Sequence, residues 1–317
     1  MKAAQFVRFG DPGVIDVVDA AVPTPGEGEV LIRVAASSVN AVDASHRSGE
    51  LGLITRRRFP QGLGVDAVGR IEGVGAGVTG FVKGERVWAM RAGADGLRRS
   101  TGLAAEFAVV HSHRVAPAPE SLSDAEAAAL IVGGYTALRA FRDVLSLRPG
   151  SRTLIRGASG GVGSAAVPIA AALGGQVIGV TSRRNGDLVR SLGAQEVFDY
   201  ATATPSDVGS ADVIFDTVGT QLSAWRSALS RNGRMATVAV GSAGALAAVG
   251  LSAIHGSRRI RMFAGEPPTG QLAALSAFVD ANHIRPVVHE TFRIDDIGRA
   301  HDRFDRGGVA GKLVIVM

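Results

Sequence analysis

A glycine-rich turn is the clearest chemical signal in this 317-residue chain. The apolar run 153–156 leads directly into Gly157-Ala158-Ser159-Gly160-Gly161-Val162-Gly163, and an alanine-rich stretch follows. A glycine-rich segment between a strand and a helix lets the backbone approach a pyrophosphate, and the helix N-terminus offers unpaired N–H groups to its charge. The pattern therefore predicts a dinucleotide phosphate cradle. An ordinary tight turn between a strand and a helix is the alternative.

The residues after the next apolar run indicate which dinucleotide is bound. The run 177–180 is followed by Thr181-Ser182-Arg183-Arg184, about 20 positions beyond the glycine motif. A site that selects NADH would place Asp or Glu here for the ribose 2′-hydroxyl, whereas a hydroxyl and two guanidinium groups suit a 2′-phosphate. We therefore expect NADPH, bound by Ser182, Arg183 and Arg184. Alternatively, one or both arginines only face solvent at a helix start.

The elements that must position these residues alternate between strand and helix from residue 151 onward. Strand-like runs at 153–155, 177–180, 197–198 and 213–215 are separated by helical stretches, of which the clearest are 161–173 and 186–192. Such alternation predicts an α/β domain with a doubly wound parallel sheet, the Rossmann arrangement.

The first 117 residues have a different, β-rich pattern of short strands separated by glycine and proline. Closely spaced glycines between residues 64 and 80 favour bulges in a curled sheet. The final strand-like segments, 289–294 and 312–316, are expected to return to this sheet. We therefore predict a discontinuous domain of residues 1–118 and 284–317, and a cofactor domain of residues 119–283. A capping box at residues 123–126 opens a helix of the cofactor domain.

Composition excludes several classes of protein. The chain has no cysteine, so it has no disulfides, no thiol nucleophile and no zinc site built on Cys ligands. The net charge of +5 comes from scattered arginines, and aromatic residues make up only 5%, so a nucleic-acid patch is not expected. We find no signal-peptide core and no long apolar run, and therefore expect a cytoplasmic protein without a membrane span.

Several blocks along the chain resemble the zinc-free quinone oxidoreductase branch (zeta-crystallin-like) of the medium-chain dehydrogenase/reductase superfamily. The blocks are GASGGVG, SSVNAVDASHRSG (37–49), GVDAVGRIEGVG (64–75), KGERV (83–87), EAAALIVGGYTALRAF (126–141), DTVG (216–219) and the terminal GKLVIVM. They cover essentially the whole chain in the family's order. The resemblance implies a GroES-like β-rich catalytic domain, a Rossmann cofactor domain with a cleft between the two, and a homodimer that pairs through the edge segment 259–263.

The resemblance also bears on the metal. Zinc-dependent relatives carry a Cys in the block that matches Asn40 and a His in the block that matches Val65, so the resemblance implies chemistry without a metal here. Hydride addition to a quinone or an α,β-unsaturated carbonyl needs less electrophilic help than reduction of an isolated carbonyl, because the negative charge delocalises. The expected activity is zinc-independent NADPH-dependent reduction of such an acceptor.

Individual residues are implied by the same resemblance. Asn40 is expected beside the nicotinamide and the substrate, and Thr136 near the carboxamide or ribose. Tyr200 is expected at the adenine-ribose edge, with a packing tyrosine as the alternative, and Lys312 either reaches the cofactor or only completes a strand. The remaining implied contacts are Ser159, Gly160, Gly161 and Val162 at the pyrophosphate, and Val218, Gly219, Val240, Gly241, Phe263 and Ala264 at later strand ends.

The proton donor is left open by the sequence. Some relatives have a tyrosine shortly after the Asn block, where this chain has Ala44-Ser45-His46. The candidates are therefore Ser45, His46, Tyr135 or water. We expect His46 to be the proton donor because imidazole titrates near neutrality. The alternative is that His46 is a surface residue without a catalytic role. The expected catalytic residues are Asn40, His46 and Tyr135.

Two other functions remain compatible with the pattern. Arg56-Arg57-Arg58 is either a solvated loop or a rim that receives the phosphates of an enoyl thioester, as in a polyketide-pathway enoyl reductase. The second alternative function is that of an NADPH-binding sensor or interaction protein that does not catalyse turnover.

Overall fold

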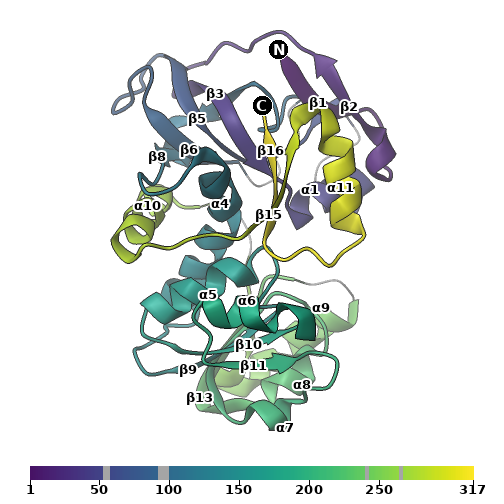
Figure 1. Ribbon diagram of the computed structural model, residues 1–317, viewed down its shortest axis with the longest axis vertical. Coiled ribbons are helices and arrows are strands. Elements are labelled where there is room, and N and C mark those ends of the chain that lie inside the picture. The colour runs from purple at the N-terminus through teal and green to yellow at the C-terminus, as the bar shows by residue number, and fades with distance from the viewer. Residues whose placement is uncertain (53–57, 92–99, 240–242, 264–266) are drawn as a thin grey trace. The chain divides into compact units, whose positions relative to one another are not determined.

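The computed structural model describes residues 1–52, 58–91, 100–239, 243–263 and 267–317, which form two units (Figure 1). Residues 1–132 and 265–317 form the first, here called the β-rich unit, and residues 133–264 form the second, the α/β unit. Within the described ranges, no helix is both long enough and apolar enough to cross a membrane.

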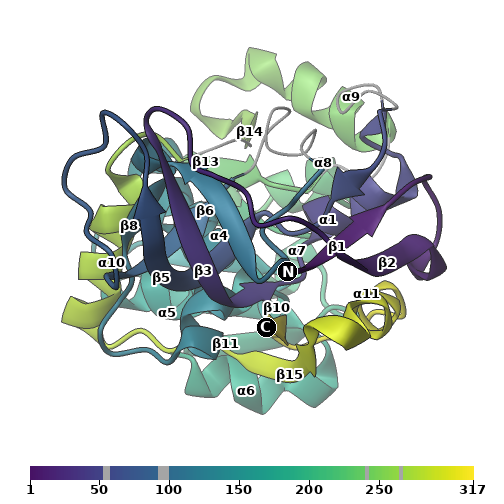
Figure 2. The same cartoon turned by 90° about the horizontal axis from the view of Figure 1, so that it is seen from above.

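The β-rich unit is built on a mainly antiparallel sheet in the order β15-β16-β3-β5-β6-β8, and β7 also pairs with β3. Figure 2 shows β3, β5 and β6 side by side. The strands are β3 (Glu29–Ser38), β5 (Asp66–Val74), β6 (Arg86–Met90), β7 (Phe107–His111), β8 (Val115–Pro117), β15 (Val288–Arg293) and β16 (Lys312–Val316). Two register shifts interrupt the β3–β5 pairing, as expected for a curled, glycine-containing sheet.

The C-terminal tail completes this sheet. Strand β16 pairs antiparallel with β3, which places Val314 opposite Ser38, and β15 pairs parallel with β16. The other elements of the unit are β1 (Lys2–Phe6), β2 (Ile15–Asp19) and β4 (Gln61–Gly62), which form a small second sheet, and the helices α1 (Ala41–Ser48), α10 (Gln271–Asn282) and α11 (Ile297–Asp305).

The two units divide the chain at positions other than those expected from the sequence. Residues 119–132 and 265–283, which the expected boundaries assign to the cofactor domain, belong to the β-rich unit. The reason is local packing: α10 packs against β8, and the Asp280 carboxylate accepts hydrogen bonds from the N–H groups of Glu120 and Ser121, both at 3.0 Å. Helix α4 (Asp124–Arg139) begins at the expected capping box, in which Ser123 N–H donates to Glu126 Oε2 at 2.9 Å.

The α/β unit contains a fully parallel sheet in the order β11-β10-β9-β12-β13-β14. Numbered along the unit, this order is 3-2-1-4-5-6, the doubly wound dinucleotide-binding topology, so the expected fold class is confirmed. The strands are β9 (Arg152–Arg156), β10 (Gln176–Thr181), β11 (Glu196–Asp199), β12 (Ala211–Asp216), β13 (Leu229–Thr237) and β14 (Ile260–Met262). The strand order reverses between β9 and β12, and this is where open α/β sheets bind ligands.

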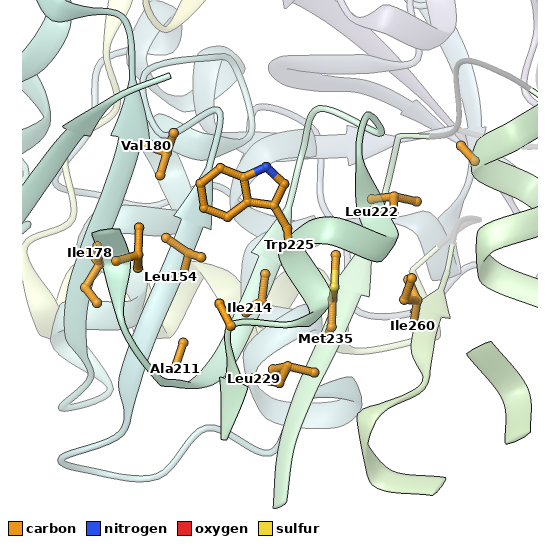
Figure 3. Close-up of a cluster of buried hydrophobic side chains, with 13 residues drawn as sticks. Leu154, Ile178, Val180, Ala211, Ile214, Leu222, Trp225, Leu229, Met235 and Ile260 are labelled. Atoms are coloured by element: carbon orange, nitrogen blue, oxygen red, sulfur yellow. The ribbon is translucent and has the colours of Figure 1, made fainter. Parts of the chain in front are cut away.

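Helices cover both faces of this sheet, as the alternating side chains show. Ile178 and Val180 of β10 join an apolar cluster with Trp225 of α8, seen in Figure 3. Gly179 between them faces the other way, where an added Cβ would lie 2.5 Å from Val189 Cγ1 of α6. The helices are α5 (Gly163–Ala172), α6 (Gly186–Ser191), α7 (Pro205–Val208), α8 (Leu222–Arg226) and α9 (Ala243–Leu251).

Candidate functional site

The glycine-rich turn connects β9 to α5 at the carboxyl edge of the parallel sheet. Gly157 has a left-handed φ of +73°, and the N–H groups of Gly157 and Ala158 both donate to Val180 O at 3.0 Å. At Gly163 an added Cβ would lie 2.1 Å from Gly157 O, so a side chain there would collide with backbone. The tight turn that the sequence pattern predicts therefore depends on glycine at both ends.

The turn leaves backbone donors available for an anion. Within the part of the chain that the structure describes, the N–H groups of Ser159, Gly161 and Val162 have no acceptor. They lie at the N-terminus of α5, where the helix dipole favours negative charge. At Gly160, an added Cβ would meet only Gly157 O, at 3.4 Å, so the turn is open to a ligand on this side. These features fit the expected pyrophosphate cradle.

The Ser159 hydroxyl belongs to a hydrogen-bond network that the sequence analysis did not find. It accepts hydrogen bonds from Thr181 Oγ1 at 2.7 Å and from Asn185 Nδ2 at 3.0 Å. Its own hydrogen therefore remains available to a third group. Thr181 and Asn185 flank the expected phosphate-binding residues, and a polar residue on each side of Ser182-Arg183-Arg184 was the available signal.

The carboxyl end of β10 presents the two arginines expected to bind a phosphate. Arg183 and Arg184 lie in a single 3-10 turn, Arg183–Asn185, and both are exposed. The Ser182 Oγ atom is buried without a hydrogen-bond partner among the described residues. Tyr200 follows the adjacent strand β11, is 67% exposed and donates its N–H to Thr181 O at 2.9 Å, so it is not a buried packing residue.

The loop after β12 forms the other side of the switch point. Val218 is 43% exposed, and Gly219 has a left-handed φ of +78°. Phe263 stacks on Phe215 with ring centroids 6.5 Å apart. Val240, Gly241 and Ala264, which the resemblance also implies, lie outside the described residues.

Tyr135 and Thr136 lie on α4, in the part that belongs to the α/β unit. Tyr135 is buried, and its hydroxyl accepts a hydrogen bond from Arg139 Nη1 at 2.9 Å. Burial raises the pKa of this hydroxyl, which Arg139 partly opposes, so Tyr135 remains protonated near neutral pH. Thr136 is half-buried.

In the β-rich unit, Asn40 is buried and its amide is bound on every side. Nδ2 donates to Ser38 O at 3.0 Å and to Asp66 Oδ2 at 2.9 Å, while Oδ1 accepts from Lys312 Nζ at 2.5 Å. Lys312 Nζ also donates to Val39 O at 2.7 Å. Lys312 therefore does more than complete a strand, because it joins the C-terminal strand to Asn40, the N-cap residue of α1. Neither hydrogen of the Asn40 amide is free for a substrate.

Two buried carboxylates, which the sequence analysis did not single out, complete this cluster. Asp66 accepts from Ser38 N and Ser38 Oγ, both at 2.6 Å, and Asp43 accepts from Asn40 N at 3.0 Å and Gly64 N at 3.2 Å. Burial, followed by repulsion from Asp66, raises the pKa of Asp43 to about 7 from its ordinary value of 3.8. Both aspartates lie inside the family-like blocks, three residues after Asn40 and next to Val65, which was the available signal.

His46 lies in the core and not on the surface. Its ring contacts Phe6 edge-on at 5.0 Å, and its Nε2 forms a 2.7 Å hydrogen bond with Gln61 Oε1. Burial lowers the pKa of His46, so the ring is neutral near pH 7. Ser45, the neighbouring candidate, is near the surface and donates to Glu50 Oε2 at 2.6 Å.

Two histidines lie at and just after the end of β7. His111 and His113 stack with ring centroids 5.5 Å apart. Among the residues that the structure describes, no three His, Asp or Glu side chains gather as metal ligands would. Arg56 and Arg57 of the arginine run lie outside the described residues, and Arg58 is exposed.

Comparison with known proteins defines the class first. Residues 26–120 match the family model of the alcohol dehydrogenase GroES-like domain, and residues 192–315 match that of the zinc-binding dehydrogenases. A GroES-like domain followed by a parallel dinucleotide-binding sheet is the architecture of the medium-chain dehydrogenase/reductase superfamily.

The relatives then specify the branch. The chain is 34% identical over 336 aligned positions to the quinone oxidoreductase of Lama guanicoe, with 100% of this chain and 98% of the relative covered. The quinone oxidoreductase structure from Coxiella burnetii is 28% identical, with a TM-score of 0.89 and coverage of 100% and 99%. A mycobacterial structure complexed with NADPH is 25% identical, with a TM-score of 0.82 and both chains fully covered. The protein therefore belongs to the quinone oxidoreductase branch, and it is an oxidoreductase that uses a nicotinamide cofactor.

Proposed function

We propose that this protein is a zinc-independent reductase that uses NADPH to reduce a quinone or an α,β-unsaturated carbonyl. The observation that supports the choice of NADPH is the pair of exposed guanidinium groups at the carboxyl end of β10, in place of an acidic residue. The NADPH-bound structure neighbour and the quinone oxidoreductase relatives support the reaction class.

Different residues of this chain bind different parts of the cofactor. The free N–H groups of the glycine-rich turn bind the pyrophosphate, and Arg183 and Arg184 bind the 2′-phosphate. When bound, NADPH supplies the hydride. Because His46 is buried and neutral and the Asn40 amide is fully committed, we propose that the product receives its proton from solvent or from Tyr135, which holds its proton near neutral pH.

An acceptor panel tests this function and its alternatives. Purified protein is mixed with NADPH, and absorbance at the nicotinamide band is followed with quinones, enones and enoyl thioesters. Turnover with quinones or enones supports the proposal. A strong preference for enoyl thioesters would favour the enoyl reductase alternative, whereas tight NADPH binding without turnover would favour a sensor.

Selectivity for NADPH depends on the two arginines. Replacing both Arg183 and Arg184 by alanine removes charge-assisted hydrogen bonds worth about 1.5–3 kcal/mol each, so KM for NADPH should rise by at least about tenfold. KM for NADH should change little, because NADH has no 2′-phosphate. Parallel steady-state kinetics with both cofactors measure this, and an unchanged NADPH-to-NADH preference would contradict the assignment. The exposed Arg190 of α6, replaced by alanine, is the matched control.

We further propose a homodimer that pairs through β14, which is an edge strand of the parallel sheet. Three exposed apolar side chains near this edge support the proposal: Leu251 at 74%, Ile254 at 87% and Met262 at 50% exposure. Light scattering should then give twice the 32.5 kDa chain mass, and Ile254→Asp should shift the protein toward monomer. A wild-type monomer would reject the proposal.

The cytoplasmic location of the protein stays a prediction.

A further inference from the structure

A buried ion pair lies at the point where the strand order of the parallel sheet reverses. Arg156 ends β9 and Asp216 ends β12, and the two residues are register partners on adjacent parallel strands. Arg156 Nη1 is hydrogen-bonded to Asp216 Oδ2, and the two residues are 6% and 0% exposed. Removing two charges from water is costly, so such a pair is weak evidence for stability and calls for another explanation.

The Asp216 carboxylate binds two segments at the carboxyl edge of the sheet. Its Oδ1 accepts hydrogen bonds from the N–H groups of Gly219 at 2.6 Å and Val218 at 3.2 Å, which belong to the loop after β12. The same oxygen accepts from Thr237 Oγ1 at 3.1 Å, at the end of β13. One carboxylate therefore binds both the loop after β12 and the end of β13.

Arg156 holds the far end of the same loop. Nη1 also donates to Thr220 O at 2.7 Å, and the guanidinium carbon lies 4.7 Å from the centre of the Trp225 ring. The Arg156 carbonyl accepts from Thr217 Oγ1 at 2.7 Å. The loop 217–220 is thus bound at both ends by one residue pair, directly beside the glycine-rich turn.

The order of the strands indicates which part of a dinucleotide this loop would meet. Strands β10 and β12 flank β9 on opposite sides, and the arginines proposed to bind the 2′-phosphate follow β10. With the pyrophosphate at the turn after β9, the nicotinamide half must extend toward β12 and β13.

We propose that Arg156 and Asp216 are positioning residues, which hold the loop 217–220 in the conformation that receives the nicotinamide half of the cofactor. This inference rests on the proposed function. The pair preorganises the loop, because a loop that is already ordered loses little further conformational freedom when the cofactor binds.

The test compares a whole cofactor with a fragment of it. NADPH binding is titrated by nicotinamide fluorescence, and binding of 2′,5′-ADP, which lacks the nicotinamide half, is titrated by calorimetry. The double variant R156M/D216N removes both buried charges together, which avoids leaving one charge unpaired, and Arg156→Lys keeps the charge without the planar fork. Arg152→Met is the matched control, because it removes a partly exposed pair with Glu196, together with hydrogen bonds to Ser210 O and Val208 O, at the opposite end of β9.

We expect R156M/D216N to remain folded by circular dichroism and to bind 2′,5′-ADP as the wild type does. Its Kd for NADPH should rise by at least about tenfold, R156K should be intermediate, and R152M should match the wild type. Equal changes for NADPH and 2′,5′-ADP, or no change in either, would overturn the positioning role. If the wild type binds neither molecule, the proposed function itself fails.

Discussion

Gly163→Ala is expected to abolish measurable NADPH binding and to destabilise the α/β unit. The added Cβ would lie 2.1 Å from Gly157 O and 2.8 Å from Ala158 Cα, and backbone atoms cannot move aside by changing rotamer. Overpacking of this kind costs about 1–3 kcal/mol or more. Because the turn itself would have to open, the N–H groups of Gly161 and Val162 would move from the anion. Loss of two hydrogen bonds to the charged pyrophosphate, worth about 1.5–3 kcal/mol each, should raise the Kd for NADPH by at least about 100-fold.

Two other glycine variants separate the effects on stability and on binding. At Gly160 the nearest contact of an added Cβ is at 3.4 Å, so Gly160→Ala should fold normally and weaken NADPH binding by occupying the open side of the turn. At Gly250 in α9 there is nothing within 4 Å, and Gly250→Ala should stabilise the protein by about 0.5–1 kcal/mol without affecting binding. Urea unfolding and fluorescence titration measure both quantities. Normal binding by G163A would show that the cradle does not depend on this turn.

Lys312→Met is expected to cause a large loss of stability in the β-rich unit. The ammonium group is buried with Asp43 and Asp66 nearby, and it donates to Val39 O and Asn40 Oδ1. Its removal leaves two acceptors without a donor and two buried carboxylates without a cation, which costs about 3–5 kcal/mol. Lys83→Met, which removes an exposed pair with Glu72, should cost less than about 1 kcal/mol. Urea unfolding at fixed pH compares the two variants.

The loss caused by K312M should also depend on pH. The pKa of Asp43 is about 7 in the folded protein and 3.8 ordinarily, so the folded state retains a proton that the unfolded state releases. Ionisation of Asp43 therefore reduces stability as pH rises from about 4 to about 7. Without Lys312, which lowers this pKa, the loss should extend to higher pH, so K312M should be more destabilised at pH 8 than at pH 5.5. Burial also lowers the pKa of Lys312 itself, and the nearby carboxylates of Asp66 and Asp43 oppose this shift.

A second substitution tests whether Asp43 is responsible for the pH dependence of the K312M variant. Adding Asp43→Asn to K312M removes one of the two uncompensated charges, so the double variant should recover part of the stability at pH 8 and show a weaker pH dependence. A loss that is equal at both pH values, with no recovery from D43N, would mean that Lys312 acts only through its hydrogen bonds to Val39 and Asn40.

Local sequence patterns were sufficient for the parts of the protein that are continuous in the chain. The glycine-rich turn, the strands around it and the arginines after β10 all lie within residues 152–185, and their spacing alone predicted where they would meet. The capping box before α4 was likewise predictable, because its hydrogen bonds join Ser123 to Glu126 within one turn. Expected element bounds differ from the observed ones by only a few residues.

Local sequence patterns did not predict which residues are buried or which distant segments pair. His46 follows the start of α1 and precedes Arg47, which resembles a surface pattern, yet Phe6 and Gln61 from other strands enclose it. The division between units also differed, because α10 packs on β8, which is more than 150 positions earlier in the sequence. In each case the deciding contact comes from an element that is distant in the chain.

The sequence by itself determined the fold class and the glycine-rich turn, and it supports the proposed preference for a 2′-phosphate, because each depends on residue types at short spacing. Only the tertiary structure decided how Asn40 is bound, since its partner Lys312 lies 272 positions away, and how the loop 217–220 is held, since Arg156 and Asp216 are 60 positions apart. The physical reason is that buried charges must be compensated by whichever groups folding brings beside them, and parallel and antiparallel strand pairing brings together residues that no local pattern connects.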